Sequence, residues 1–158
     1  MIATTLLIKN ASVVATMDDV RTELADASVL IRGNVIEAVG PADALPAQAD
    51  EVIDASRHAL IPGLVNTHHH MFQSLTRAVP GAQDAELFAW LKTLYPIWSG
   101  LTPDMLEVST QIAMAELLLS GCTTSSDHLY LFPNGCTLDH TIEAAQRIGM
   151  RSTRRVAR

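Results

Sequence analysis

Three consecutive histidines, His68, His69 and His70, follow a short apolar run. If residues 60–67 form a buried strand, successive side chains point to opposite faces, so His68 and His70 share one face and His69 takes the other. Two imidazoles on one face can bind one metal ion, because neutral imidazole is the commonest metal ligand in proteins. The alternative is a polar strand end that faces solvent. The turn expected at Pro62-Gly63 favours the metal pair.

Composition limits the class of protein. The 158 residues are 48% hydrophobic and 18% charged, as in a globular domain, and the net charge of −6 argues against a nucleic-acid binder. Cys122 and Cys136 are too few for a disulfide scaffold. The start of the chain does not resemble a signal peptide, and no apolar run approaches the roughly 18 residues of a membrane span. We therefore expect a cytoplasmic protein that does not bind membranes.

The first 59 residues are expected to form a small β-sandwich domain with a structural role. Two apolar strands, 28–32 and 35–39, flank Gly33-Asn34, a two-residue connection typical of a tight hairpin. Further strands are predicted at 6–14 and 51–54. Residues 60–158 then form the second domain.

A long connection, residues 71–101, follows the histidines and carries Gln73, Trp90 and Trp98. A short helix is predicted within it at 86–94. Connections of this length in compact domains are usually functional lids or disordered, and the aromatic residues argue against disorder. The alternative for the tryptophans is that they only pack the connection onto the body.

The remainder predicts alternating helices and strands. Thr102-Pro103-Asp104 is a typical helix start, and Gly121 is a typical helix end. One apolar face is predicted from Met105, Val108, Ile112, Ala115 and Leu119.

A strand is expected at 122–132, a helix from the Thr137 cap to Gly149, and a third strand from Met150. This β-α-β-α-β order predicts a parallel sheet, whose C-terminal edge would gather His68, His70 and Asp127-His128. The alternative for His128 is a hydrogen-bonded structural histidine.

The motif at 62–70, Pro-Gly-Leu-Val-Asn-Thr-His-His-His, preceded by a small β domain, resembles the start of amidohydrolase-superfamily enzymes. Residues 68–77 and 125–130 resemble the branch that contains 8-oxoguanine deaminase and the hydroxyatrazine-type aminohydrolases. The resemblance implies an α/β fold in which a (β/α)₈ TIM-like barrel follows the β domain.

The same resemblance implies one Zn²⁺ per complete subunit, with His68 and His70 as the first two ligands. It also implies that Gln73 hydrogen-bonds the substrate ring and that Trp90 walls the pocket. His128, at the C-terminal edge of the predicted sheet, is the third residue expected to contact substrate. The remaining ligands and the acid/base residues are expected downstream, because the chain after residue 60 is far shorter than the about 250 residues of a whole barrel. The chain is therefore expected to be the truncated N-terminal portion of an enzyme, inactive alone and a homo-oligomer at full length.

The implied reaction is hydrolytic deamination of a purine or triazine ring, with 8-oxoguanine as the favoured substrate. The alternatives are a guanine or S-adenosylhomocysteine deaminase, a chlorotriazine hydrolase, or a catalytically inactive product.

The end of the chain departs from this pattern, because four arginines crowd residues 151–158 where an apolar barrel strand is expected. We interpret this as the result of one lost nucleotide after Arg151, which shifted the reading frame. The alternative is a genuine basic tail. Sequencing the gene distinguishes the two.

Overall fold

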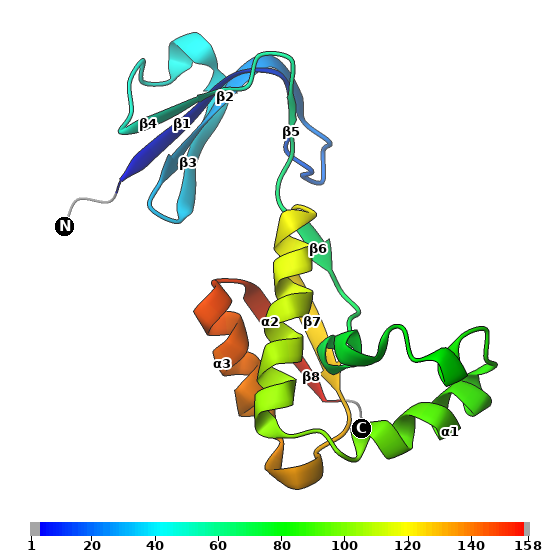
Figure 1. Ribbon diagram of the computed structural model, residues 1–158. Coiled ribbons are helices and arrows are strands. Elements are labelled where there is room, and N and C mark those ends of the chain that lie inside the picture. Colours follow the sequence, from blue (N-terminus) through cyan, green and yellow to red (C-terminus); the bar gives the residue numbers. More distant parts are fainter. Residues whose placement is uncertain (1–3, 157–158) are drawn as a thin grey trace. The chain divides into compact units, whose positions relative to one another are not determined.

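The computed structural model describes residues 4–156, with side chains described as far as Ser152. The chain has a mixed α/β structure that divides into two compact units, Met1–Pro62 and Gly63–Arg158 (Figure 1). The boundary expected after residue 59 falls within the first unit.

The first unit is a single sheet around β1 (Thr5–Ala15). The other strands are β2 (Glu23–Arg32), β3 (Val35–Pro41), β4 (Glu51–Asp54) and β5 (Ala59–Leu60), with a 3-10 turn at Ala42–Ala44. Strand order is β3-β2-β1-β4, and β5 also pairs with β1. The predicted hairpin is confirmed, since Arg32 pairs with Val35 across Gly33-Asn34.

A sandwich of two sheets was expected for this unit, and the described residues form one sheet instead. The long β1 explains the difference. Its first half pairs in parallel with β4 and its second half with β5, so both short strands extend the same sheet.

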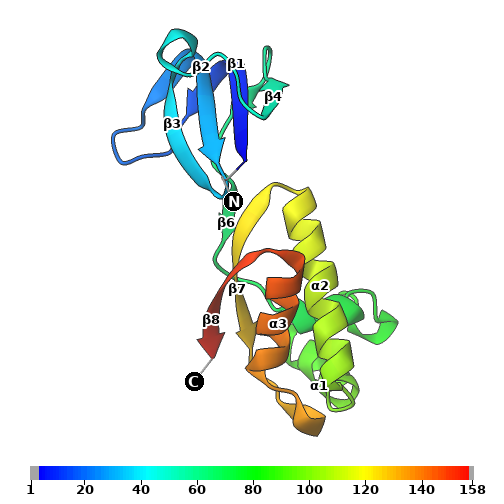
Figure 2. The same ribbon diagram turned by 90° about the vertical axis from the view of Figure 1, so that its left-hand side faces the viewer.

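The second unit contains three parallel strands in the order β6-β7-β8. These are β6 (Leu64–Asn66), β7 (Cys122–Leu129) and β8 (Arg151–Val156). Helices α2 (Pro103–Leu119) and α3 (Leu138–Ile148) connect them and cover one face of the sheet (Figures 1 and 2). The predicted β-α-β-α-β order is confirmed, and the strand expected at 122–132 ends at Leu129.

The strand expected at residues 60–67 is wrong in both length and burial. Pro62 lacks the N–H that a strand ladder needs, and the chain leaves β5 before it enters the three-residue β6. Leu64 and Val65 are 51% and 63% exposed, because within the described residues β6 has β7 as its one neighbour. The three histidines therefore lie beyond the end of the strand.

The long connection is ordered by aromatic packing. It contains 3-10 turns at Met71–Thr76 (η2) and Pro80–Ala82 (η3), then helix α1 (Leu87–Trp98), which extends beyond the predicted 86–94. The buried Trp98 ring meets Phe72 edge to face at 5.2 Å between centroids and Trp90 at 5.3 Å. The connection is thus anchored to its unit by Trp98.

Helix α2 begins as predicted, with the Thr102 hydroxyl accepting a hydrogen bond from Met105 N–H, but it buries a different face. The predicted apolar face, which includes Met105, Ile112 and Leu119, is largely exposed, with Leu119 at 90%. The buried residues are Leu106, Ser109, Thr110, Ala113 and Met114. Both hydroxyls among them donate to the Leu106 carbonyl oxygen, at 2.9 and 2.8 Å, so they are buried without losing hydrogen bonds.

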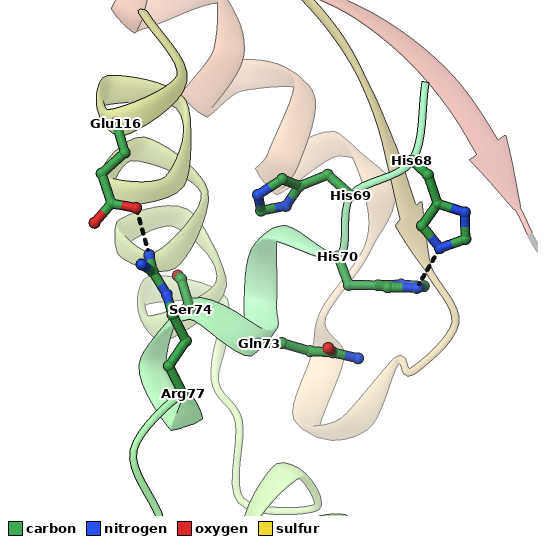
Figure 3. A pocket seen from close by; sticks show the side chains of 7 residues that line it. All are labelled: His68, His69, His70, Gln73, Ser74, Arg77 and Glu116. Atoms are coloured by element: carbon green, nitrogen blue, oxygen red, sulfur yellow. Dashed lines mark hydrogen bonds and ion pairs between the residues drawn. The ribbon is translucent and has the colours of Figure 1, made fainter. Parts of the chain in front are cut away.

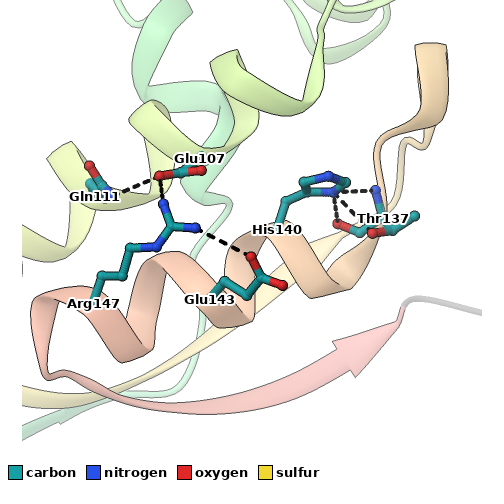
Figure 4. Close-up of polar contacts among 6 residues, drawn as sticks. All are labelled: Glu107, Gln111, Thr137, His140, Glu143 and Arg147. Atoms are coloured by element: carbon teal, nitrogen blue, oxygen red, sulfur yellow. Dashed lines mark hydrogen bonds and ion pairs between the residues drawn. The ribbon is translucent and has the colours of Figure 1, made fainter.

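Polar contacts join α2 to α3 (Figure 4). The Arg147 guanidinium donates to Glu107 on α2 and to Glu143 on its own helix, and Gln111 donates to the same Glu107 carboxylate. At the start of α3 the Thr137 N–H donates to Nδ1 of His140, which caps the helix.

Strand β8 begins one residue after the predicted position, and its main chain pairs with β7 from Thr124 to Leu129. The arginine side chains that motivated the frame-shift interpretation, from Arg154 onward, lie outside the described residues. No helix between residues 4 and 156 has the length and apolar character needed to cross a membrane.

Candidate metal centre

His68 and His70 face each other just beyond the end of β6 (Figure 3). Their Nε2 atoms are 3.1 Å apart, and the ring planes are inclined by 77°. His69 projects to the other side of the chain, toward α2 (Figure 3). The alternation argument predicted this arrangement correctly, although the strand on which it was based ends earlier.

The separation of the two nitrogens fits a shared divalent cation. Two imidazole nitrogens bound tetrahedrally to Zn²⁺ at about 2.0–2.1 Å lie about 3.3 Å apart. Among the residues that the structure describes, no group of three or more His, Cys, Asp or Glu side chains is close enough to hold a metal. The described residues therefore supply at most a two-imidazole part of such a site.

A hydrogen bond to the next strand fixes the His70 ring. Nδ1 of His70 lies 2.8 Å from the main-chain oxygen of His128, so Nδ1 carries the proton and donates it. In the neutral ring, Nε2 is then the nitrogen with a free lone pair, and it is the one that faces His68. Metal-binding histidines commonly donate their other N–H in this way.

His128 contributes to the site in two further ways. Its ring stacks on that of His68, with centroids 4.5 Å apart and planes inclined by 21°. Its main-chain N–H donates to the oxygen of His69 at 2.8 Å. Its own Nε2 is buried and has no hydrogen-bond partner among the described residues.

Gln73 lies close to the histidine pair and is bonded to a residue that sequence reasoning did not single out. The Gln73 side-chain N–H donates to the Tyr130 hydroxyl at 2.8 Å, and the Tyr130 ring lies 5.3 Å from that of His70. Burial raises the pKa of Tyr130 above its ordinary value, so the hydroxyl stays protonated at neutral pH. The sequence signal for Tyr130 was its place in the 125–130 stretch on which the family resemblance rests, although no role was assigned to it.

Trp90 is placed differently. It packs against Trp98 in the aromatic cluster, and it does not line the pockets described around His68 and His70. The pockets described around the histidine pair thus bring four of the five candidate site residues together, and Trp90 is not among their lining residues. The four are His68, His70, Gln73 and His128.

An ion pair lines one side of the hollow beside His69 (Figure 3). Arg77 and Glu116 approach to 2.7 Å, with both side chains about half exposed, so Glu116 is paired rather than an isolated solvated charge. Burial, followed by the nearby Arg77 charge, lowers the pKa of His69 below its ordinary value. His69 is therefore neutral at pH 7.

Comparison with known proteins gives a consistent picture. Residues 59–153 match the model of the Amidohydrolase family. The chain is 50% identical to 8-oxoguanine deaminase of Pseudomonas aeruginosa over 133 residues, which cover 82% of this chain and 29% of that protein. It is 32% identical to hydroxydechloroatrazine ethylaminohydrolase of Pseudomonas sp. strain ADP, over 94% of this chain and 34% of that protein.

Among solved structures, atrazine chlorohydrolase from Arthrobacter aurescens in complex with zinc superposes with a TM-score of 0.84 and 33% identity, over 94% of this chain and 35% of that one. The chain thus spans about a third of the length of each of these three proteins.

Proposed function

Because this chain belongs to the amidohydrolase family, we propose that it forms part of a zinc-dependent hydrolase that deaminates a purine or triazine ring. The observation that carries the proposal is the pair of Nε2 atoms 3.1 Å apart, with the His70 ring fixed by the main chain of His128. His68 and His70 are the side chains that would hold the metal.

His68 and His70 would hold a divalent cation here, and the bound ion would supply Lewis acidity toward water or substrate at neutral pH. The chain's own residues orient the two imidazole rings that would bind the ion. The His128 carbonyl keeps the His70 proton on Nδ1, and the stacked His128 ring restricts the orientation of His68.

Gln73 is the candidate for recognising the substrate ring. Since its N–H is engaged by Tyr130, its side-chain oxygen is left as an acceptor for a ring N–H of the substrate. Trp90 packs against Trp98, and its role as a wall of the substrate pocket stays a prediction. Tyr130 and His128 are the aromatic side chains whose rings lie beside the histidine pair, so we assign the first contacts of a bound ring to them.

8-Oxoguanine is the favoured substrate, because the relative that is 50% identical carries that name. A triazine is the second candidate, supported by the TM-score of 0.84 with atrazine chlorohydrolase. Both rings are planar and carry polar ring nitrogens, so the histidine site alone does not distinguish them.

The metal site is tested by titrating the 158-residue chain with Zn²⁺ in a calorimeter. One ion should bind, and His68→Ala and His70→Ala should each weaken binding by about tenfold or more, since each removes one of two ligands. His58→Ala is the matched control, because His58 lies in the other unit. Equal affinity in all four proteins would contradict the proposal.

Ring specificity is tested by NMR on the same chain loaded with Zn²⁺. Addition of 8-oxoguanine should shift the side-chain amide signals of Gln73, and addition of a hydroxytriazine should shift them less. Ammonia release measured in the same samples shows whether the chain turns over. A larger response to the triazine would favour the second candidate, and no response to either ring would contradict both.

A further inference from the structure

Three hydrogen bonds tie the end of β7 to the segment that carries the histidines. The Met71 N–H donates to Oδ1 of Asp127 at 3.0 Å, and Nδ1 of His70 donates to the His128 oxygen at 2.8 Å. The third runs from the His128 N–H to the oxygen of His69, also at 2.8 Å. Residues 69–71 are thus held by Asp127 and His128, which lie more than 50 positions further along the chain.

Asp127 makes the one bond of the three in which β7 contributes a side chain. The other two use the main chain of His128, which is present whatever residue occupies that position. The Met71 N–H is also the first N–H of the 3-10 turn Met71–Thr76, and no local side chain caps that turn. Asp127 therefore supplies the cap from a neighbouring strand.

Burying the Asp127 carboxyl at this position costs desolvation free energy. It is only 4% exposed, and its second oxygen, Oδ2, is buried without a hydrogen-bond partner among the described residues. Burial raises the pKa of the carboxyl, and the Met71 bond opposes that effect. An apolar residue of similar volume would avoid this desolvation cost. The carboxyl therefore lowers the stability of the fold unless its hydrogen bond to the Met71 N–H offsets the cost.

We propose that Asp127 is a positioning residue that holds the Met71 amide and thereby fixes His70 opposite His68. The proposal rests on the function proposed above, because the value of the position lies in metal binding. Met71 follows His70 directly, so movement of this amide moves the His70 main chain. Ligand distances in metal sites are defined to within about 0.2 Å, which makes such movement costly to affinity.

The test compares three substitutions in the 158-residue chain. Asp127→Asn keeps an oxygen that can accept from Met71, while Asp127→Ala and Asp127→Leu remove the acceptor, the latter with a side chain of the same branching that leaves no cavity. The matched control is Ser126→Ala, which changes the adjacent buried residue, whose hydroxyl likewise has no partner among the described residues.

Zn²⁺ affinity should fall about 10-fold to 100-fold in the Ala and Leu variants, as is typical when the support of a ligand is removed. The Asn variant and the Ser126→Ala control should stay within about threefold of the parent chain. Equal affinity of the Ala and Leu variants and the parent would overturn the proposal. Loss of affinity in a folded Asn variant would also overturn it, because charge rather than the bond would then be responsible.

A metal-free measurement separates this proposal from the function on which it rests. In the parent chain, ¹⁵N NMR should show the His70 proton held on Nδ1, and in the Ala and Leu variants a mixture of tautomers. If the parent fails to bind Zn²⁺ but the tautomer still depends on Asp127, the proposed function is wrong and the positioning role stands. If both variants without an acceptor unfold, Asp127 is a determinant of folding, and the positioning role is wrong.

Discussion

Gly63 and Thr123 lie so close together that no side chain fits at position 63. A Cβ placed there would be 2.2 Å from the Thr123 hydroxyl oxygen and 2.8 Å from the Thr123 Cβ. The approach follows from the pairing of β6 with β7, in which Leu64 is opposite Cys122. The glycine of the Pro-Gly motif is thus required for space at the start of the strand that leads to the histidines.

Gly63→Ala should destabilise the second unit by about 1–3 kcal/mol, the usual effect of overpacking. Urea unfolding followed by tryptophan fluorescence measures this, because both tryptophans lie in that unit. Thr123→Ala alone should change stability by less than about 0.5 kcal/mol, since Thr123 is exposed. The double variant should recover part of the loss but not all, because the Cβ of residue 123 remains. A neutral Gly63→Ala would show that the contact relaxes freely.

Much of this fold follows from local patterns. The Gly33-Asn34 hairpin, the Thr102 cap and the order of strands and helices depend on residues close in sequence, and the structure contains each of them. The buried face of α2 did not follow, because Ser109 and Thr110 count as polar in a sequence pattern. Their hydroxyls bond within the helix, and that contact is visible only in the structure.

In the candidate site, too, some features follow from local sequence and others depend on contacts between residues far apart in the chain. The facing of His68 and His70 was predictable from alternation along the chain. The bonds from His70 to His128 and from Met71 to Asp127 join residues 58 and 56 positions apart, and no local pattern encodes them. Trp90 was assigned by resemblance, and its packing on Trp98 is a tertiary contact that sequence reasoning could not locate.

Helix α2 offers a direct test of which face is buried. Ile112→Gln, on the exposed face, should change the free energy of unfolding by no more than about 0.5 kcal/mol. Ala113→Leu, one position along and 1% exposed, should cost about 1–3 kcal/mol because the added atoms have no room. Circular dichroism during urea unfolding gives both values. A larger loss of stability in Ile112→Gln than in Ala113→Leu would show instead that the apolar face predicted from the sequence is the buried one.

Trp98 should be the main anchor of the connection after the histidines. It is fully buried, and its indole N–H donates to the Thr76 hydroxyl at 3.0 Å. Trp98→Ala should destabilise the second unit by about 3–5 kcal/mol. Thr76→Val, which leaves the indole N–H without its partner, should cost about 1–3 kcal/mol.

The control for this prediction is Trp90→Ala, because Trp90 is only half-buried and should lose less stability than Trp98. These unfolding transitions are best followed by circular dichroism, since the substitutions remove fluorophores. Equal losses of stability in Trp98→Ala and Trp90→Ala would contradict the assignment of Trp98 as the main anchor.

In the first unit, Asp50 should titrate below the ordinary carboxyl value of 3.8, because it accepts hydrogen bonds from the Thr5 main-chain N–H and hydroxyl. A lowered folded-state pKa means that the carboxylate stabilises the folded chain above pH 3.8 and loses that effect as the pH falls through the folded value. Thr5→Val should raise the Asp50 pKa only part of the way, since the N–H, the larger cause, remains. Carbon-13 NMR of the Asp50 carboxyl measures the shift. An unchanged pKa would show that the hydroxyl contributes nothing.

The most direct measurement of the central claim is ¹⁵N NMR of the histidine rings during a Zn²⁺ titration of the 158-residue chain. If His68 and His70 share the ion, their Nε2 signals should shift together with a common dissociation constant, while the His70 Nδ1 signal stays that of a protonated nitrogen. The His69 signals should not follow, because that ring points to the other side of the chain. Saturation of binding with only one of the two Nε2 signals shifted, or with neither, would contradict a shared metal site.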